Sequence, residues 1–155
     1  PSGLVGDRQL RGGHLAFGHP RHRPRLPVGH RHRAGPAVPI TGGTVAGRLN
    51  GTVLAGGGDW ATTRGAVTEL EARYLIRADD GATIDIVNRG YHFAEPGVMA
   101  RIDAGEDVPE GEYYYRTSPM FRTDAPGYEW LTRTVFIGMA RSEGTQVCIR
   151  FYSLA

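Results

Sequence analysis

Two charged residues, Glu71 and Arg73, stand two positions apart in residues 67–78, where apolar and polar residues alternate. Side chains along a strand point alternately to its two faces, so this carboxylate and this guanidinium share a face and can pair. Further polar residues fall in other segments of the same kind: Asn88, Tyr115 and Arg116. If these side chains converge inside a barrel, they line a polar pocket, the usual form of a small-ligand site. On the outside they form surface ion pairs worth about 0–1 kcal/mol each, and both alternatives stay open.

Other groups that could do chemistry make weaker candidates. The glycine run at residues 56–58 is followed by no Gly-Lys-Ser/Thr and no predicted helix, which excludes a phosphate loop. His30 and His32 could ligate a metal, but a metal site needs more ligands at fixed spacing, and His92 lies far along the chain. Cys148 falls within a predicted strand with no obvious base beside it, so it is a poor candidate nucleophile. We therefore expect no metal and no cofactor.

The chain has 155 residues, the length of one domain, and a single cysteine, so no disulfide can form within it. No apolar run approaches the roughly 20 residues of a membrane span. The first residues lack the apolar stretch of a signal peptide. These features predict a soluble cytoplasmic protein.

Residues 1–36 differ in composition from the rest. Residues 1–33 hold seven arginines and one acid, a net charge of +6, whereas residues 34–155 carry a net charge of −4. We expect this leader to add little to the core, because it lacks periodic apolar residues apart from a short run, Leu15-Ala16-Phe17, that could form an edge strand. The leader is read as a flexible arm, as a nucleic-acid-binding arm, or as the product of a shifted reading frame in GC-rich DNA.

The segments that must position the polar residues read as strands joined by tight turns. Asn50-Gly51 and Asp79-Asp80-Gly81 are hairpin signals. Pro96 near a first turn and Gly105 at a C-terminus predict one short helix, residues 96–104. The sequence therefore predicts an all-β domain at residues 37–155, an antiparallel β-barrel of about eight strands with one short helix. Two short strands are expected within residues 39–54, joined by a turn at Asn50-Gly51. The other expected strands are residues 67–78, 82–89, 113–123, 131–141 and 146–153.

Several short blocks, taken in order, resemble a known family. They are VPITGGT at 38–44, GGGDW at 56–60, EARY at 71–74, DGA at 80–82, NRG at 88–90, YYR at 114–116 and WL at 130–131. Together they resemble the uncharacterised family DUF3237, also called UPF0311, from about Val38 to Tyr152. The resemblance implies a closed or nearly closed antiparallel barrel, similar in outline to allene oxide cyclase and dirigent barrels. Those relatives bind hydrophobic small molecules and steer cyclisation or coupling without a cofactor. The leader stands where members usually open with an apolar strand.

Two functions are consistent with these residues: a cofactor-free cyclase or isomerase acting on an apolar metabolite, and a non-catalytic binding barrel. In the enzyme, Glu71 or Asp59 would act as general base or acid. Arg73 and Arg116 would stabilise developing negative charge, and Tyr115 would donate a hydrogen bond. Three residues of the expected site contact the ligand: Trp60, Asn88 and Arg116. The expected partner is a small apolar metabolite, with no nucleic acid and no membrane, and the chain is a candidate homo-oligomer.

The orientation of one strand decides this site. If Glu71 and Arg73 point into the barrel, the alternate residues of the same strand point outward. These are Leu70, Ala72, Tyr74 and Ile76. An outward apolar face needs a cover, either the helix at 96–104 or a second subunit. The resemblance to ligand-binding barrels favours this arrangement, with Trp60, Asn88, Tyr115 and Arg116 near the pair.

Overall fold

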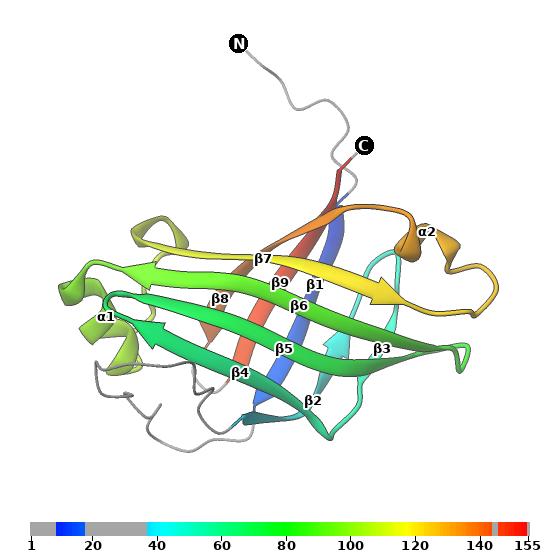
Figure 1. Cartoon of the computed structure of the whole chain (residues 1–155), viewed down its shortest axis with the longest axis horizontal. Helices are drawn as coiled ribbons and strands as arrows, with labels where there is room; N and C mark the ends of the chain where they lie inside the picture. The colour runs from blue at the N-terminus through cyan, green and yellow to red at the C-terminus, as the bar shows by residue number, and fades with distance from the viewer. Residues whose placement is uncertain (1–8, 18–36, 144–145, 155) are drawn as a thin grey trace, which may run out of the picture.

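Antiparallel strands account for most of the chain in the computed structural model, which describes residues 9–17, 37–143 and 146–154 (Figure 1). The strands are β1 (Gln9–Phe17), β2 (Val38–Val45), β3 (Gly51–Val53), β4 (Gly57–Arg64), β5 (Val67–Ala78), β6 (Thr83–Ala94), β7 (Tyr113–Arg122), β8 (Phe136–Glu143) and β9 (Gln146–Ser153). The helices are α1 (Pro96–Asp103), α2 (Glu129–Thr132) and one 3₁₀ turn, η1 (Glu110–Glu112).

The strand pairings form a ring. The order is β1-β9-β8-β7-β6-β5-β3-β2-β4. Strand β1 also pairs with β2, which closes the ring, and β4 also pairs with β5. Every pairing is antiparallel. The predicted all-β antiparallel fold with a short helix is therefore confirmed, and the helix α1 matches the predicted residues 96–104. The ring also contains a ninth strand, and the four-residue α2 was not predicted.

The hairpin of β5 and β6 is the longest in the sheet and follows the predicted alternation. Eleven residue pairs join the two strands, from Val67↔Phe93 to Arg77↔Thr83. The turn between them has Gly81 at φ +92°, a left-handed conformation that favours glycine. The Asp80 carboxylate accepts a hydrogen bond from the backbone N–H of Ala82 at 3.0 Å, which fixes the turn.

Two predicted features differ from the structure near the N-terminus. The hairpin of β2 and β3 turns through residues 46–50 rather than at Asn50-Gly51 alone, and the Asn50 side chain closes the loop with 3.0 Å hydrogen bonds to the N–H and the C=O of Gly47. The leader contributes β1, which pairs with β9 and β2. The sequence indicated only a candidate edge strand at Leu15-Ala16-Phe17 in this part of the leader. The rest of the leader lies outside the described residues.

The barrel has two unlike ends, with α1 and α2 at opposite ends in Figure 1. Near α2 the interior is apolar and aromatic: the Phe136 ring lies 5.1 Å from Phe121 and 6.0 Å from Trp130. The other fully buried large side chains are Ile40, Ile76, Ile84, Ile86 and Leu131. Helix α1 has no buried residue and no side-chain N-cap. The end covered by α1 is therefore the less tightly packed one.

Candidate functional site

Polar side chains fill the part of the barrel interior between the apolar core and α1. All six come from β4, β5, β6 and β7, and each is at most 7% exposed: Asp59, Tyr74, Asn88, His92, Tyr115 and Thr117. We call these six residues the polar layer. Alternation along each strand directs them inward, with the apolar residues of the same strands on either side.

The sheet register places the members of the layer side by side. Asp59 of β4 is opposite Ala72 of β5, and Ala72 is opposite Asn88 of β6. Four residues further along β6, about 13 Å, His92 is opposite Tyr115 of β7. Since side chains two and four residues apart on a strand share a face, the layer is one continuous interior surface.

Aromatic rings surround the imidazole of His92. The Tyr115 ring lies 4.8 Å from it, centroid to centroid, and the Tyr113 ring lies 5.7 Å away, edge-on. These ring contacts restrict the orientation of the imidazole.

Burial raises the pKa of the Tyr74 hydroxyl well above its usual value of 10. The neighbouring Tyr115 and Asp59 raise it further, because a phenolate beside them would face added negative charge. Tyr74 is therefore a protonated phenol at neutral pH, able to donate a hydrogen bond to an oxygen atom in the layer.

Two oxygen atoms of the layer have no hydrogen-bond partner among the described residues, Asn88 Oδ1 and Thr117 Oγ1. An unsatisfied buried polar atom costs about 1–3 kcal/mol. Thr117 lies between two glycines, opposite Gly90 on β6 and Gly138 on β8. A Cβ atom at Gly138 would come 2.1 Å from Thr117 Oγ1, so the absence of a side chain there makes room for this hydroxyl. Both atoms are acceptors suited to a hydroxyl or water inside the barrel.

The predicted pocket around Glu71 and Arg73 is wrong. Tyr74 lies in the core, whereas the Arg73 side chain is 57% exposed and pairs with Glu71 on the outer face, Arg73 Nε to Glu71 Oε1 at 2.8 Å. Glu71 also accepts from Arg89 Nε at 2.6 Å. The guanidinium groups of Arg73 and Arg89 hold the pKa of the Glu71 carboxyl below its usual range. The physical reason is burial: the face with Leu70, Ala72, Tyr74 and Ile76 loses far more apolar surface to the interior.

The seven predicted site residues thus divide between two faces of the sheet. Asp59, Asn88 and Tyr115 lie inside, and their roles stay predictions. The other four lie outside: Glu71, Arg73, Trp60 and Arg116. Arg73 lies 5.7 Å over the Trp60 ring, and Arg116 lies 5.5 Å over the exposed ring of Tyr114. The predicted site therefore mixed two surfaces that the sheet keeps apart.

Sequence reasoning missed Tyr74, His92 and Thr117 as members of the interior layer. The alternation of faces along a strand could have identified His92 and Thr117. His92 is four residues from Asn88 and Thr117 is two residues from Tyr115, so each shares a face with a predicted site residue. Tyr74 was assigned to the outside together with the rest of its face.

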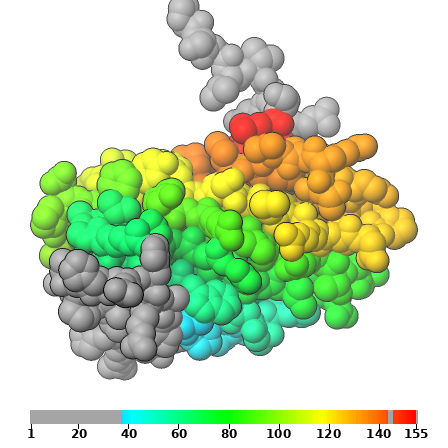
Figure 2. Space-filling model, in the orientation of Figure 1, coloured from blue at the N-terminus to red at the C-terminus, as the bar shows by residue number. Residues whose placement is uncertain are grey.

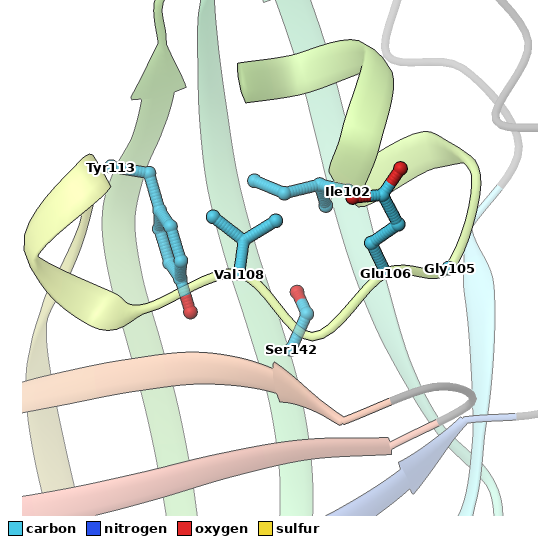
Figure 3. A pocket seen from close by; sticks show the side chains of 6 residues that line it. All are labelled: Ile102, Gly105, Glu106, Val108, Tyr113 and Ser142. Atoms are coloured by element: carbon cyan, nitrogen blue, oxygen red, sulfur yellow. The ribbon is translucent and has the colours of Figure 1, made fainter.

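A small cavity of about 30 Å³ opens where α1 meets the barrel, lined by Ile102, Gly105, Glu106, Val108, Tyr113 and Ser142 (Figure 3). It can hold water, which needs about 10–15 Å³ per molecule by this measure. Tyr113 joins this cavity to the polar layer, because its ring also contacts His92. The cavity therefore lies next to the polar layer, with the Tyr113 ring between them.

The described part of the chain offers neither a metal site nor a membrane-spanning helix. It contains no group of three or more His, Cys, Asp or Glu side chains placed to hold a metal ion. None of its helices has the length and apolar character needed to cross a membrane. Cys148 is buried, and burial raises the pKa of its thiol, which disfavours the reactive thiolate.

Comparisons with known proteins agree with this fold. The sequence model of the family described as Protein of unknown function (DUF3237) matches residues 17–154. A UPF0311 protein of Clostridium acetobutylicum is 38% identical over 120 residues, which cover 76% of this chain and 76% of that protein. The crystal structure of a conserved protein of unknown function from Rhodopseudomonas palustris superposes with a TM-score of 0.82, at 27% identity over 100% of both chains.

A second similar solved structure is described as barrel-like. It is a beta-barrel like protein from Acinetobacter baumannii, with a TM-score of 0.73 and 30% identity, covering 97% of this chain and 96% of that chain. The predicted resemblance, from about Val38 to Tyr152, is thereby confirmed. The chain belongs to the DUF3237 family, also called UPF0311.

Proposed function

We propose that this barrel binds a small molecule with an apolar body and one hydroxyl or carbonyl group, and that the polar group enters the polar layer. The observation that carries the proposal is the pair of buried acceptors, Asn88 Oδ1 and Thr117 Oγ1, without partners among the described residues. A ligand hydroxyl can donate to Asn88 Oδ1, and the Thr117 hydroxyl can accept from a ligand hydroxyl or donate to a ligand carbonyl. These bonds are favoured because burial removes the competing water.

The surroundings of the layer set the character of the rest of the ligand. The walls on either side are apolar, with Leu70, Ile86, Ala140 and Ile149 buried in the same interior. Small residues lie beside the two acceptors, Ala72 opposite Asn88 and Gly138 opposite Thr117. A ligand with an apolar body fits these walls, since its burial contributes about 25 cal/mol per Å².

Access requires movement of α1. The 30 Å³ cavity at this end admits water but is far below the roughly 300 Å³ at which small-molecule pockets begin. Helix α1 has no side-chain N-cap and packs against the core only through partly buried side chains, Val98, Met99 and Ile102, so its displacement exposes less apolar surface than loss of a buried strand would. We take the α1 end as the entrance.

A second candidate function, cofactor-independent isomerisation or cyclisation, is favoured by Tyr74. Its phenol stays protonated beside Asp59 and Tyr115. Asp59 would remove a proton from the carbon next to a ligand carbonyl, and the Tyr74 hydroxyl would donate to the resulting enolate oxygen. Return of the same proton from Asp59 to another carbon completes an isomerisation with no oxidant and no cofactor.

Binding is tested with three probes that share one apolar body: 2-naphthol, 2-acetonaphthone and naphthalene. The expected result is a rise in unfolding temperature with the hydroxyl and carbonyl probes and a smaller rise with naphthalene; saturation at 100 times the Kd adds about 2.7 kcal/mol. Thr117→Val, which keeps the shape and removes the oxygen, should abolish the preference for 2-naphthol, whereas Glu71→Gln on the outer face should keep it. Equal shifts with all three probes, or none with any, would contradict the proposal.

Catalysis is tested with the carbonyl probe alone. In D₂O, a base that removes and returns protons exchanges the methyl protons of 2-acetonaphthone for deuterium, which NMR follows directly. The wild type should exceed the buffer rate, Asp59→Asn should fall to it, and Glu71→Gln should match the wild type. Binding without exchange above the buffer rate would leave a non-catalytic binding barrel and remove the enzyme.

A further inference from the structure

We propose that the outer face of β4, β5, β6 and β7 binds single-stranded nucleic acid, with bases stacked on its exposed rings and phosphates held by its arginines. This surface lies on the opposite side of the sheet from the polar layer, so the inference does not depend on the proposed ligand. In Figure 1 the four strands lie in front, and Figure 2 shows the same face, coloured from green to yellow.

Positive charge is concentrated on this face. Alternation along the four strands directs six arginines and three acids outward, a net charge of +3. The other residues of 34–155 hold five arginines and twelve acids, so the overall charge of −4 hides the basic face. The expectation of no nucleic-acid partner rested on the absence of such a face. The outward arginines are Arg64, Arg73, Arg77, Arg89, Arg116 and Arg122, and the outward acids are Glu69, Glu71 and Asp85.

The acids near the centre of the face are already paired with arginines. Glu69 Oε1 lies 3.7 Å from Arg64 Nη1. Glu71 pairs with both Arg73 and Arg89, and its Oε2 lies 2.6 Å from Arg89 Nε. One carboxylate shared by two guanidinium groups leaves a net positive charge at that point. A phosphate on this face therefore meets more positive charge than the carboxylates beside it cancel.

Exposed rings stand beside arginines on β6 and β7. The rings of Phe93 and Tyr114 stack with centroids 4.8 Å apart, and Tyr91, two residues from Phe93 on β6, is 53% exposed. Tyr91 is opposite Arg116. Among the described residues the Arg116 guanidinium donates to a carbonyl, the C=O of Tyr115 at 2.9 Å, and to no acid. Rings and arginines combined on one sheet suit a single strand, because the rings stack on bases and the arginines bind phosphates.

The same mixture of residue types disfavours a membrane surface. Segments that lie in a lipid interface keep apolar side chains on one side and charged side chains on the other. Here Tyr91 stands among charged residues, opposite Glu69 on β5 and Arg116 on β7 and two residues from Arg89 on its own strand. Its ring cannot enter hydrocarbon without these charges, which are costly there. A single strand has no such requirement, since its bases and phosphates alternate as well.

The test measures binding of the full chain to fluorescein-labelled oligothymidylate of about 12 nucleotides, by fluorescence anisotropy. The wild type should bind this strand more tightly than a duplex of the same length, because stacking on a ring needs unpaired bases. Tyr91→Leu removes one ring without changing charge and should weaken binding by roughly 5-fold to 100-fold, the range for one base stack. Arg116→Gln should weaken binding and reduce the slope of log affinity against log salt by about 0.7, the value for one phosphate contact.

Two controls separate this face from the rest of the chain. Arg133→Gln, in the exposed loop after α2, removes the same charge off the face and should keep the wild-type affinity and salt slope. The leader keeps its seven arginines in every variant. Equal binding by the wild type, Tyr91→Leu and Arg116→Gln would therefore assign the binding to another part of the chain and overturn the proposal. Circular dichroism should show the same fold in every variant.

A wild type that binds no oligothymidylate at low salt also overturns the proposal, and two further measurements then identify the occupant of the face. Binding to vesicles of phosphatidylserine and phosphatidylcholine, weakened by Tyr91→Leu, would make it a membrane surface. A dimer in sedimentation velocity that Tyr91→Leu dissociates would make it an interface between copies, in spite of the repulsion between two faces of the same net charge.

Discussion

The hydroxyl of Thr117 occupies the space that a side chain at Gly138 would need, since a Cβ atom there would lie 2.1 Å from Thr117 Oγ1. The same Cβ would also lie 3.1 Å from atoms of Ile149 and Phe151. The position of this hydroxyl, which belongs to the proposed ligand site, therefore depends on how closely β7 and β8 pack.

Gly138→Ala should therefore destabilise the protein by about 1–3 kcal/mol, the usual cost of overpacking. Urea unfolding measures this. Gly97→Ala is the matched control, because a Cβ at Gly97 meets no atom within 4 Å and alanine favours the helix by up to about 1 kcal/mol. Adding Thr117→Ala to Gly138→Ala should recover part of the loss; no recovery would show that the hydroxyl is not what the new Cβ meets.

The ion pairs of Glu71 make one part of the stability depend on acid pH. Arg73 and Arg89 lower the pKa of this carboxyl in the folded state, below its ordinary value of 4.5. The stabilisation is therefore present above about pH 4.5 and is lost as the pH falls through the folded pKa. The difference in unfolding free energy between the wild type and Glu71→Gln should be constant near neutral pH and shrink in acid. A difference that is independent of pH would contradict this origin.

The sequence predicted β5 over its whole length and the first part of β6, because both segments alternate and Asp79-Asp80-Gly81 fixes the turn. Strand β6 continues to Ala94, beyond the predicted end at Arg89. The sequence also predicted α1, where Pro96 begins the helix. Alternation determines which residues share a face but not which face is inside. In β5 the face with Leu70, Tyr74 and Ile76 lies inside, because its burial removes the most apolar surface from water. The sequence-based prediction favoured a polar pocket and therefore placed this face outside.

The local sequence pattern did not predict strand β1 over its full length. Its sequence contains Gly12-Gly13 and no regular alternation, and its register with β9 shifts between Leu10 and Gly13. Here β1 completes the ring because β9 and β2 both offer it an edge. Long-range pairing of this kind depends on strands far apart in the sequence, so a local reading finds only the apolar end of the strand at Leu15-Ala16-Phe17.

The buried hydroxyl of Tyr74 should lower stability in alkali. Its folded pKa lies above the ordinary value of 10, so stability is unaffected below about pH 10 and falls as the pH rises above it, because the unfolded chain ionises first. Tyr74→Phe removes this group and should show a smaller alkaline loss of unfolding free energy than the wild type. Absorbance titration of the folded protein should show one fewer late-titrating tyrosine in the variant; identical titrations would contradict the burial of this phenol.

Neighbouring residues on β5 give the sharpest test of which face lies inside. Ile76 is 1% exposed and Leu75 is 42% exposed, although the two differ little in size and follow one another in the chain. Ile76→Ala should lower the free energy of unfolding by about 2–5 kcal/mol, since it removes buried methyl groups and leaves a cavity. Leu75→Ala should cost about 0.5 kcal/mol or less, as most surface substitutions do. Urea unfolding of the two variants under the same conditions measures both values. A larger loss at Leu75 than at Ile76 would reverse the assignment of the faces, and with it the interior position of Tyr74.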